Sequence, residues 1–382
     1  MPSSRCVAVL FDAQLDLATE VHRGVVDYLG QHTDWQVLPL PAAQEDRLPE
    51  LLRGGMVDGV IGSFVSDSWA AALGPVPRVN TSSLSTIRSI DSVVVDDHAI
   101  GRLAAEHFLS NGLRSLGYVG LGGCVYSAAR LDGFLAALDA SGGTGRAGVA
   151  CLTWLPQRLH ELDDWLAGLA RPAGVFCASD LVARAVVQSC RRLGLSVPSE
   201  VAVVGVGDSY LDAVFAGIPL STVPLPGRRL GAAAAELLAA RLAGYRGPVR
   251  RVVVPPTCLL SRSSSSVVHG TDEVVSGCLA YIQGHLHEWL RVDALARRFG
   301  VSRRTLEMRF QAALGRSPAG EIRRRRLDLA RQLLRDGSLP IREVGRRCGY
   351  LEPQQFSAFF RTQMGLAPRQ YRQQAAPAAV ER

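Results

Sequence analysis

Short apolar, β-branched runs alternate with amphipathic segments over residues 5–262, and this alternation predicts a series of strands and helices. The predicted strands are 6–11, 37–40, 59–61, 78–79, 93–95, 117–120, 174–177 and 201–206. The predicted helices include 15–29, 98–111, 128–140, 159–169, 181–193 and 228–242. Strands that alternate with helices form parallel sheets covered by those helices. The length of the pattern predicts two doubly wound lobes with a ligand crevice between them.

The C-terminal part of the chain has a helical pattern that occurs twice. Residues 292–302 form a short amphipathic segment that turns at Gly300 and leads into a second segment, 303–310. Residues 341–350 repeat this with a turn at Gly349, followed by 353–361. Apolar residues at helical spacing anchor the second segment of each copy: Leu306 and Phe310, then Phe356 and Phe360. This is the helix-turn-helix layout, in which the second helix can enter the major groove of DNA.

Charge divides the chain in the same place as the change of pattern. The formal net charge is +7, but residues 274–382 hold 20 basic and nine acidic residues, a net of +11, and the remainder sums to −4. A polyanionic partner is therefore expected for the helical part. The eight cysteines are scattered without a CxxC pair, so we expect reduced thiols, no metal and a cytoplasmic location. No apolar run suits a membrane span or a signal peptide.

Two connecting segments set the expected domain organisation. The stretch Ser261–Ser266 is polar and low in complexity, and it predicts a flexible linker. We expect a ligand-sensing domain over 1–262, a linker over 263–273, a helical domain over 274–374 and a frayed tail over 375–382. A single helix over 318–335 would span about 27 Å, which would hold the two units near one duplex turn apart. This helix carries the run Arg323–Arg326, of which some members must point away from any one partner.

The helical part resembles the AraC/XylS family of transcription regulators over about 274–372. The matching stretches are 295–306, 309–310, 314–318, 326–334, 341–350, 356–360 and 365–372, in the family's order and spacing. The resemblance implies base contacts at Arg304, Glu307 and Met308. It is consistent with the periodicity, which turns these residues and Gln311 away from buried Leu306 and Phe310.

The remaining candidate DNA-binding residues follow from the same helical geometry. Arg304 can fork onto guanine, and Glu307 can accept from a cytosine amine. In the second unit the outward positions are Pro353, Gln354, Ser357 and Ala358, among which Gln354 is the best base-reading side chain. Short Ala358 suggests that this unit depends more on backbone or thymine-methyl contacts. Arg303 and Arg361 complete the candidate set.

The first 262 residues resemble the periplasmic-binding-protein-like sensor of the LacI/GalR repressors. The resemblance is carried by 93–97 with Gly101 and Ala104, 127–134, 178–183, 194–198, 203–208 and 219–223. It implies a sugar effector gripped by Arg130, with Asp180 and Asp208 after strands as carboxylate acceptors for hydroxyl groups. Phe11, Asp12 and Tyr126 are further candidates by their positions after strands. Helix capping is the alternative role for Asp180 and Asp97.

Together these features predict a sequence-specific DNA-binding regulator, with activation expected from the family. Its effector would be a small sugar, with xylose or another pentose among the candidates. Double-stranded DNA, RNA polymerase and a second copy of the chain are the expected partners. No cofactor is expected, and the Gly120–Gly123 run does not complete a dinucleotide fingerprint. The alternatives are a sensor for a non-sugar ligand such as a purine, and a sugar-binding or sugar-processing protein with an incidental helical tail.

Overall fold

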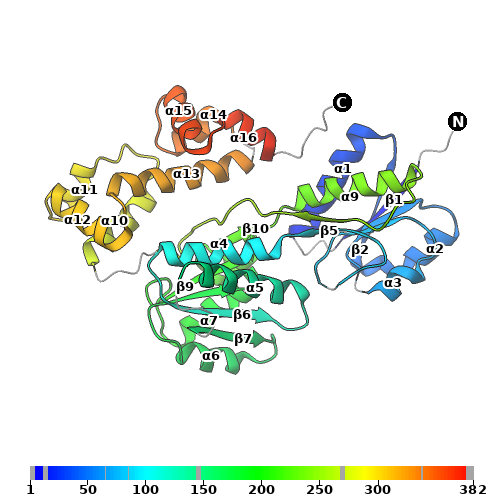
Figure 1. Ribbon diagram of the computed structural model, residues 1–382, viewed down its shortest axis with the longest axis horizontal. Coiled ribbons are helices and arrows are strands. Elements are labelled where there is room, and N and C mark those ends of the chain that lie inside the picture. The colour runs from blue at the N-terminus through cyan, green and yellow to red at the C-terminus, as the bar shows by residue number, and fades with distance from the viewer. Residues whose placement is uncertain are drawn as a thin grey trace.

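The computed structural model describes residues 5–11, 16–64, 66–84, 86–142, 148–266, 272–336 and 339–375. Figure 1 shows two sheet-containing lobes and a separate helical domain, formed by residues 272–375. Within these described residues, lobe 1 has a six-stranded parallel sheet of order β11-β5-β4-β3-β1-β2 and lobe 2 a five-stranded parallel sheet of order β10-β9-β8-β6-β7. The predicted fold class, two doubly wound α/β lobes followed by a helical domain, is confirmed.

Lobe 1 is built from both ends of the α/β region. Its strands are β1 (Cys6–Phe11), β2 (Gln36–Pro41), β3 (Gly59–Gly62), β4 (Arg78–Asn80), β5 (Asp91–Val95) and β11 (Arg251–Val254). Helices α1 (Asp16–His32) and α9 (Gly227–Leu242) pack together, and η1 (Ala42–Arg47), α2 (Leu48–Arg53) and α3 (Asp67–Ala72) complete the lobe. Along β1, Val7 and Val9 join one apolar cluster while Ala8 and Leu10 join another. This alternation is why a nearly continuous apolar run forms a strand buried on both faces.

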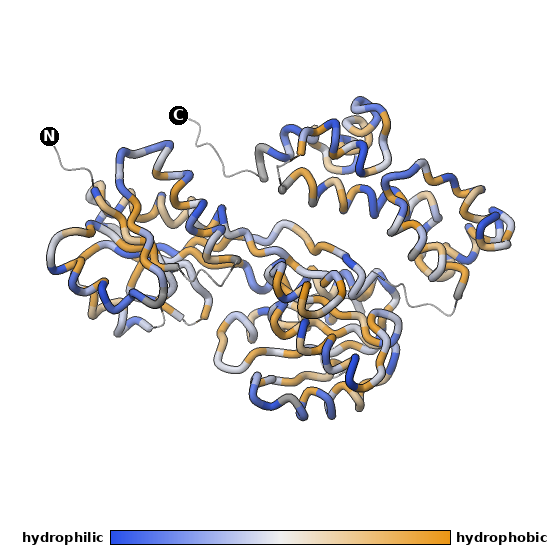
Figure 2. Tube along the Cα trace, turned by 180° about the vertical axis from the view of Figure 1, so that it is seen from behind, coloured by the Kyte–Doolittle hydropathy of each residue, from blue (hydrophilic) through white to orange (hydrophobic). Residues whose placement is uncertain are grey.

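Lobe 2 lies between the two segments of lobe 1 in the sequence. Its strands are β6 (Ser115–Leu121), β7 (Val149–Trp154), β8 (Ala173–Cys177), β9 (Val201–Gly207) and β10 (Ser221–Pro224). Its helices are α4 (Asp97–Ser110), α5 (Val125–Ala140), α6 (Leu159–Ala167), α7 (Asp180–Arg192) and α8 (Tyr210–Ala216). Phe108 and Phe134 cover one face of the sheet, and Leu162 and Val186 cover the other. Figure 2 shows the apolar segments running along the strands of both lobes.

The helical domain contains α10 (Glu273–Gly284), α11 (Val292–Arg298), α12 (Arg303–Leu314), α13 (Pro318–Asp336), α14 (Ile341–Arg347), α15 (Pro353–Met364) and α16 (Pro368–Ala375). It has two apolar cores, one around Phe310 and one around Phe356. The spacer helix α13 contributes Ile322 to the first core and Ala330 and Leu334 to the second. Because its 19 residues span about 28 Å, this one helix fixes the separation of the two cores.

The predicted flexible linker is wrong for residues 261–266. Ser264 and Ser265 are fully buried, and the Ser264 hydroxyl donates to the Val203 carbonyl and accepts from the Ser221 amide. Leu260 forms an isolated antiparallel bridge with Thr222 of β10. Serine hydroxyls supply hydrogen bonds that let a polar segment lie against a sheet. We call residues 255–266 the connector. Residues 267–271 of the predicted linker and residues 376–382 of the predicted tail, 375–382, lie outside the described residues.

Candidate nucleic-acid interface and sensor site

The first helix-turn-helix unit consists of α11, a turn at Gly300 and α12. Gly300 has a φ of 67°, a conformation that glycine adopts without steric cost. The Ser302 hydroxyl accepts a hydrogen bond from the Thr305 amide at 3.1 Å, so Ser302 is the N-cap of α12. Leu306 and Phe310 are fully buried, as their spacing predicted. The opposite face of α12 is therefore directed away from the core.

That outward face carries the predicted base-reading residues. Arg304, Met308 and Gln311 are exposed, with Met308 at 60%. Glu307 is half-buried and accepts a hydrogen bond from Arg303 Nε at 2.9 Å; Arg303 also contacts Asp293 of α11 at 3.3 Å. These contacts raise the pKa of Arg303, chiefly through the Glu307 hydrogen bond. A cytosine amine would thus have to share Glu307 with Arg303, which sequence spacing alone did not reveal.

The second unit consists of α14, a turn at Gly349 and α15. Gly349 has a φ of 78°, and a Cβ there would lie 2.5 Å from the Leu286 carbonyl oxygen, so both conformation and space require glycine. Phe356 and Phe360 are fully buried, as expected. Gln354, Ala358 and Arg361 are exposed, whereas Pro353 and Ser357 are half-buried. This face offers fewer long polar side chains than α12.

In lobe 2, Arg130 lies at the centre of a buried polar cluster. Its side chain is 6% exposed; Nε donates to Asp97 at 2.8 Å and Nη1 donates to the Ala178 carbonyl. The guanidinium also lies 4.5 Å from the centroid of the Tyr126 ring. Burial raises the pKa of Asp97, although Arg130 opposes that effect. Arg130 therefore joins α5, the start of α4 and the end of β8.

The carboxylates predicted after strands occupy two different environments. Asp180 is 2% exposed and accepts from the Ser209 amide and the Thr222 hydroxyl, both at 2.8 Å. Burial raises its pKa to about 6 despite these bonds. Asp180 does not cap α7, because that position belongs to Ser179; similarly, Asp96 rather than Asp97 caps α4. Asp180 instead fixes the loop that follows β9.

Asp208 follows β9 with a φ of 65°, in the left-handed region. Its carboxylate pairs with Arg262 Nη2 of the connector at 2.6 Å, an interaction that the sequence analysis missed because it assigned Arg262 to a linker. Phe11 ends β1, but its side chain and all of Asp12 lie outside the described residues. The structure thus brings Arg130 and Tyr126 together and places Asp180 next to the loop that carries Asp208.

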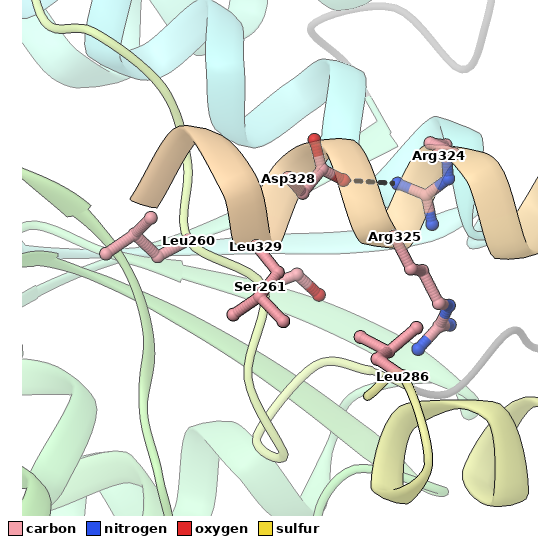
Figure 3. Close-up of a pocket in the computed structure, with 7 residues that line it drawn as sticks. All are labelled: Leu260, Ser261, Leu286, Arg324, Arg325, Asp328 and Leu329. Atoms are coloured by element: carbon pink, nitrogen blue, oxygen red, sulfur yellow. Dashed lines mark hydrogen bonds and ion pairs between the residues drawn. The ribbon is translucent and has the colours of Figure 1, made fainter. Parts of the chain in front are cut away.

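Two hollows lie apart from the predicted ligand residues. A groove of about 240 Å³ opens at the ends of β6 and β7, lined among others by Gly122, Ser127 and Thr153. A smaller cavity of about 50 Å³ lies between the connector and α13 (Figure 3), where Leu260 and Ser261 face Leu286, Arg324, Arg325, Asp328 and Leu329. The described residues contain no cluster of three metal-ligating side chains and no helix long and apolar enough to cross a membrane.

A two-lobed α/β domain joined to paired helix-turn-helix units defines a DNA-binding transcription regulator. The periplasmic binding protein-like domain matches residues 105–265, and a helix-turn-helix domain matches residues 295–374. The chain is 28% identical to the xylose operon regulatory protein of Escherichia coli strain K12, over 96% of both chains. It is 30% identical to the HTH-type transcriptional regulator reg1 of Streptomyces lividans, over 58% of this chain and 68% of that protein.

A solved structure extends the likeness across both domains. The structure of a xylose-binding transcription activator matches 97% of this chain and 99% of its own, with a TM-score of 0.62 at 25% identity. The chain belongs to the family of helix-turn-helix transcription regulators that carry a periplasmic binding protein-like sensor, here with a C-terminal DNA-binding domain of the AraC type. Both expected family resemblances are thereby confirmed.

Proposed function

We propose that this chain is a sugar-responsive transcription activator whose helices α12 and α15 enter successive major grooves on one side of a duplex. The observation that supports this most directly is the participation of α13 in both helical cores, because it sets one separation for the two outward faces. The basic surplus of residues 274–382 supplies attraction to phosphate.

The proposed DNA binding is tested by selecting binding sites from random duplexes with the full-length chain and then measuring the affinity of the chain for the selected sites. Arg304→Ala should weaken binding about 5- to 150-fold, equivalent to about 1–3 kcal/mol for one bidentate base contact, and relax specificity at one base pair. Arg102→Ala, an equal charge change at an exposed position of α4, serves as the control. Uniform weakening over all sequences would assign Arg304 to phosphate, and an unchanged affinity would remove it from the interface.

For the effector, we propose a small sugar in the crevice between the lobes, with xylose first because two relatives are described by that sugar. Arg130 suits this role because a planar fork can hold paired hydroxyl acceptors. A thermal-shift screen of pentoses, hexoses and purines would show which class stabilises the protein. If only a purine stabilises the protein, the effector is a purine and not a sugar. If no compound in the screen stabilises it, the sensor proposal is contradicted.

Arg130→Lys tests the proposed sugar-binding role of Arg130 while it keeps a cation beside Asp97. We expect this variant to fold, as judged by circular dichroism, and to lose the sugar-dependent rise in melting temperature. Asp208→Asn tests the second predicted acceptor in the same assay. A full sugar-dependent shift in either variant would remove that residue from the ligand site.

We also propose that the chain acts as a cytoplasmic homodimer that recruits RNA polymerase. Helix α8 carries Tyr210, Leu211, Val214 and Phe215 at 74, 56, 52 and 57% exposure, a concentration of apolar surface on a two-turn helix. A second copy can cover it because a two-fold contact pairs the same patch on both chains. Sedimentation should give a dimer for the wild type and for Met56→Ser, a control at an isolated exposed residue, and a monomer for Phe215→Ser. A wild-type monomer with and without sugar and DNA would contradict the dimer.

A further inference from the structure

The spacer helix α13 contacts the sensor as well as both helical cores. Arg325 Nη2 donates to the Ser266 carbonyl of the connector, and Arg331 Nη2 donates to the Thr257 carbonyl, each at 3.3 Å. The cavity in Figure 3 lies along the same contact. Thus α13 is held near both ends of the connector, although joining two DNA-binding units requires neither contact.

A buried ionic cluster stands on the α13 side of this contact. Glu321 is 1% exposed and pairs with Arg324 and Arg325 at 2.7 Å and with Arg316 at 3.4 Å. Burial would raise the pKa of Glu321, but Arg324 and Arg325 lower it to about 2. Because burying charges is costly even when they are paired, such a cluster is more informative about a specific docking geometry than about stability.

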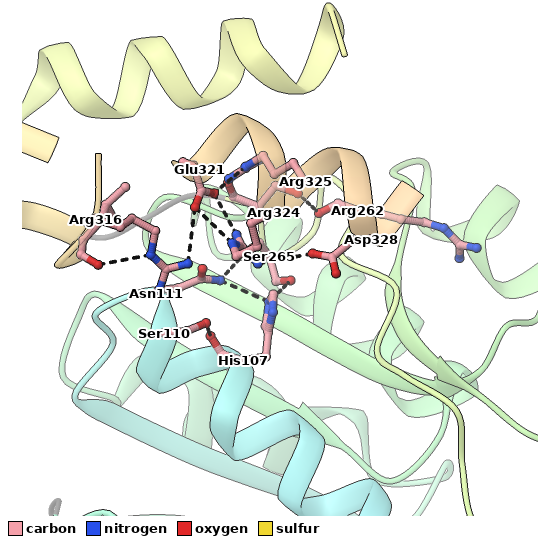
Figure 4. Close-up of polar contacts among 12 residues, drawn as sticks. His107, Ser110, Asn111, Arg262, Ser265, Arg316, Glu321, Arg324, Arg325 and Asp328 are labelled. Atoms are coloured by element: carbon pink, nitrogen blue, oxygen red, sulfur yellow. Dashed lines mark hydrogen bonds and ion pairs between the residues drawn. The ribbon is translucent and has the colours of Figure 1, made fainter. Parts of the chain in front are cut away.

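On the sensor side, the connector is fastened to lobe 2. Figure 4 shows the cluster of α13 above His107 of α4, Asn111 at the C-cap of α4, and Ser265 of the connector. His107 Nε2 lies 2.7 Å from the Ser265 hydroxyl, and Asn111 Nδ2 donates to the Ser265 carbonyl at 3.1 Å. Burial, together with Arg324 and Arg325, lowers the pKa of His107 to about 3, so the imidazole is neutral in this arrangement.

The connector also reaches the end of β9. Arg262 pairs with Asp208 at 2.6 Å and donates to the Leu220 carbonyl at 3.0 Å. The Ser264 carbonyl accepts from the Val203 amide of β9 at 2.7 Å. The same twelve-residue segment is therefore bonded to β9 through one set of atoms and to α13 through another.

We propose that the connector and α13 form an intramolecular docking surface that fixes the DNA-binding domain against lobe 2, and that the Arg262–Asp208 pair links this surface to the ligand-dependent state of the sensor. Docking itself does not depend on the effector, whereas the linking role rests on the proposed function. A ligand can change DNA binding only if it has different affinities for two arrangements of the protein. A docking surface that can bind or release α13 provides two such arrangements.

Small-angle X-ray scattering of the full-length chain tests whether α13 is held on this docking surface. Arg325→Gln removes the bond to Ser266 but leaves Glu321 paired with Arg324, so the helical domain should still fold. Arg323→Gln, an equal charge change at an exposed position on the same helix, is the matched control. We expect a larger maximum dimension for Arg325→Gln and for Asn111→Ala, which acts from the sensor side, and wild-type scattering for Arg323→Gln. Identical scattering from all four proteins would overturn the dock.

Arg262→Gln tests the link to the sensor. The variant should keep a sugar-dependent thermal shift, because it leaves Arg130 and the Asp208 carboxylate in place and removes only the 2.6 Å ion pair between Asp208 and the connector. Its DNA affinity should change less than twofold on adding sugar, against a larger change in the wild type. A wild-type response in Arg262→Gln would refute the link, whereas the absence of any sugar-dependent thermal shift in the wild type would instead refute the proposed effector.

Discussion

Replacing Gly133 by alanine should destabilise the sensor by forcing α4 and α5 apart. A Cβ at Gly133 would lie 2.1 Å from the His98 carbonyl oxygen, and one at Gly101 would lie 2.1 Å from the Arg130 carbonyl oxygen. The two helices therefore cross with backbone against backbone. Relief of either overlap requires the two helices to separate by about 1.4–1.9 Å, since non-bonded heavy atoms are attracted best at about 3.5–4.0 Å.

The magnitude follows from two opposing effects. Overpacking a rigid core costs about 1–3 kcal/mol, and the upper half of that range applies because the obstructing atom is backbone. Alanine is favoured over glycine in a helix by up to about 1 kcal/mol, which leaves a loss of about 2 kcal/mol. For a domain of this size such a loss lowers the melting temperature by about 4–8 °C.

Gly133→Ala should also weaken ligand binding. Arg130 lies one turn before Gly133 on α5, so displacing the helix moves its guanidinium relative to Asp97 and the Ala178 carbonyl. Scanning calorimetry with and without sugar measures both effects. The matched control is Gly30→Ala in α1, where an added Cβ meets nothing within 4 Å, and it should be neutral or stabilising by up to about 1 kcal/mol. Equal stability of the two variants, with equal sugar shifts, would refute the close-crossing argument.

Three further predictions address other parts of the chain. In the unfolded state the imidazole of His107 takes up a proton below about pH 6.5, but the buried imidazole of the folded state does not. The contribution of His107 to stability is therefore full above that pH and falls by about 1.4 kcal/mol per pH unit as the pH drops towards 3. Urea unfolding of His107→Gln should show a smaller loss of stability in acid than the wild type, and parallel pH profiles of the two proteins would contradict this. Gly345→Ala should change the melting temperature of the helical domain by less than about 2 °C. Alanine already occupies the equivalent position at Ala296, and the three atoms nearest to an added Cβ all belong to the Phe356 side chain, beginning at 3.1 Å. A large loss would show that this helix crossing cannot adjust. Asp91→Ala should cost about 3–5 kcal/mol in denaturant unfolding, because it leaves two half-buried arginines without the buried carboxylate that they share. A loss below about 1 kcal/mol would show that water replaces that carboxylate.

Local periodicity predicted most of the fold because its cause is local. Burial of every third or fourth residue identified α12 and α15, and β-branched runs identified β1, β5, β8 and β9. The strands β7, β10 and β11 went unpredicted, although the valine run of β11 is typical of a strand. Alternate residues of β7 are only half-buried, and β10 is a four-residue strand of Ser, Thr, Val and Pro that is buried by segments distant in sequence. Their strand state is set by sheet partners, which composition does not indicate.

The candidate site was less predictable because its side chains are oriented by long-range partners. The family resemblance drew attention to Arg130 and Asp208, but Asp97 is 33 residues from Arg130 and Arg262 is 54 residues from Asp208. The serine-rich connector was mistaken for a flexible linker for the same reason. Its hydroxyls pair with Ser221 and His107, which lie 44 and 158 residues from Ser265. A polar segment and a buried, fully bonded segment can have the same composition.

The four successive arginines of α13, Arg323–Arg326, make different contacts in the folded protein. Arg324 and Arg325 pair with Glu321, and Arg326 is 7% exposed, donates to the Glu288 carbonyl and lies 5.3 Å from the Tyr350 ring centroid. Among these four arginines, Arg323 alone is exposed. The basic surplus that indicated a DNA partner is thus partly used inside the protein, to hold α13 to both helix-turn-helix units and to the sensor. Under the docking proposed above, a movement of the DNA-binding domain relative to lobe 2 acts on α13, the same helix that joins its two cores, so the proposed sensing movement would also bear on the spacing of the two outward faces.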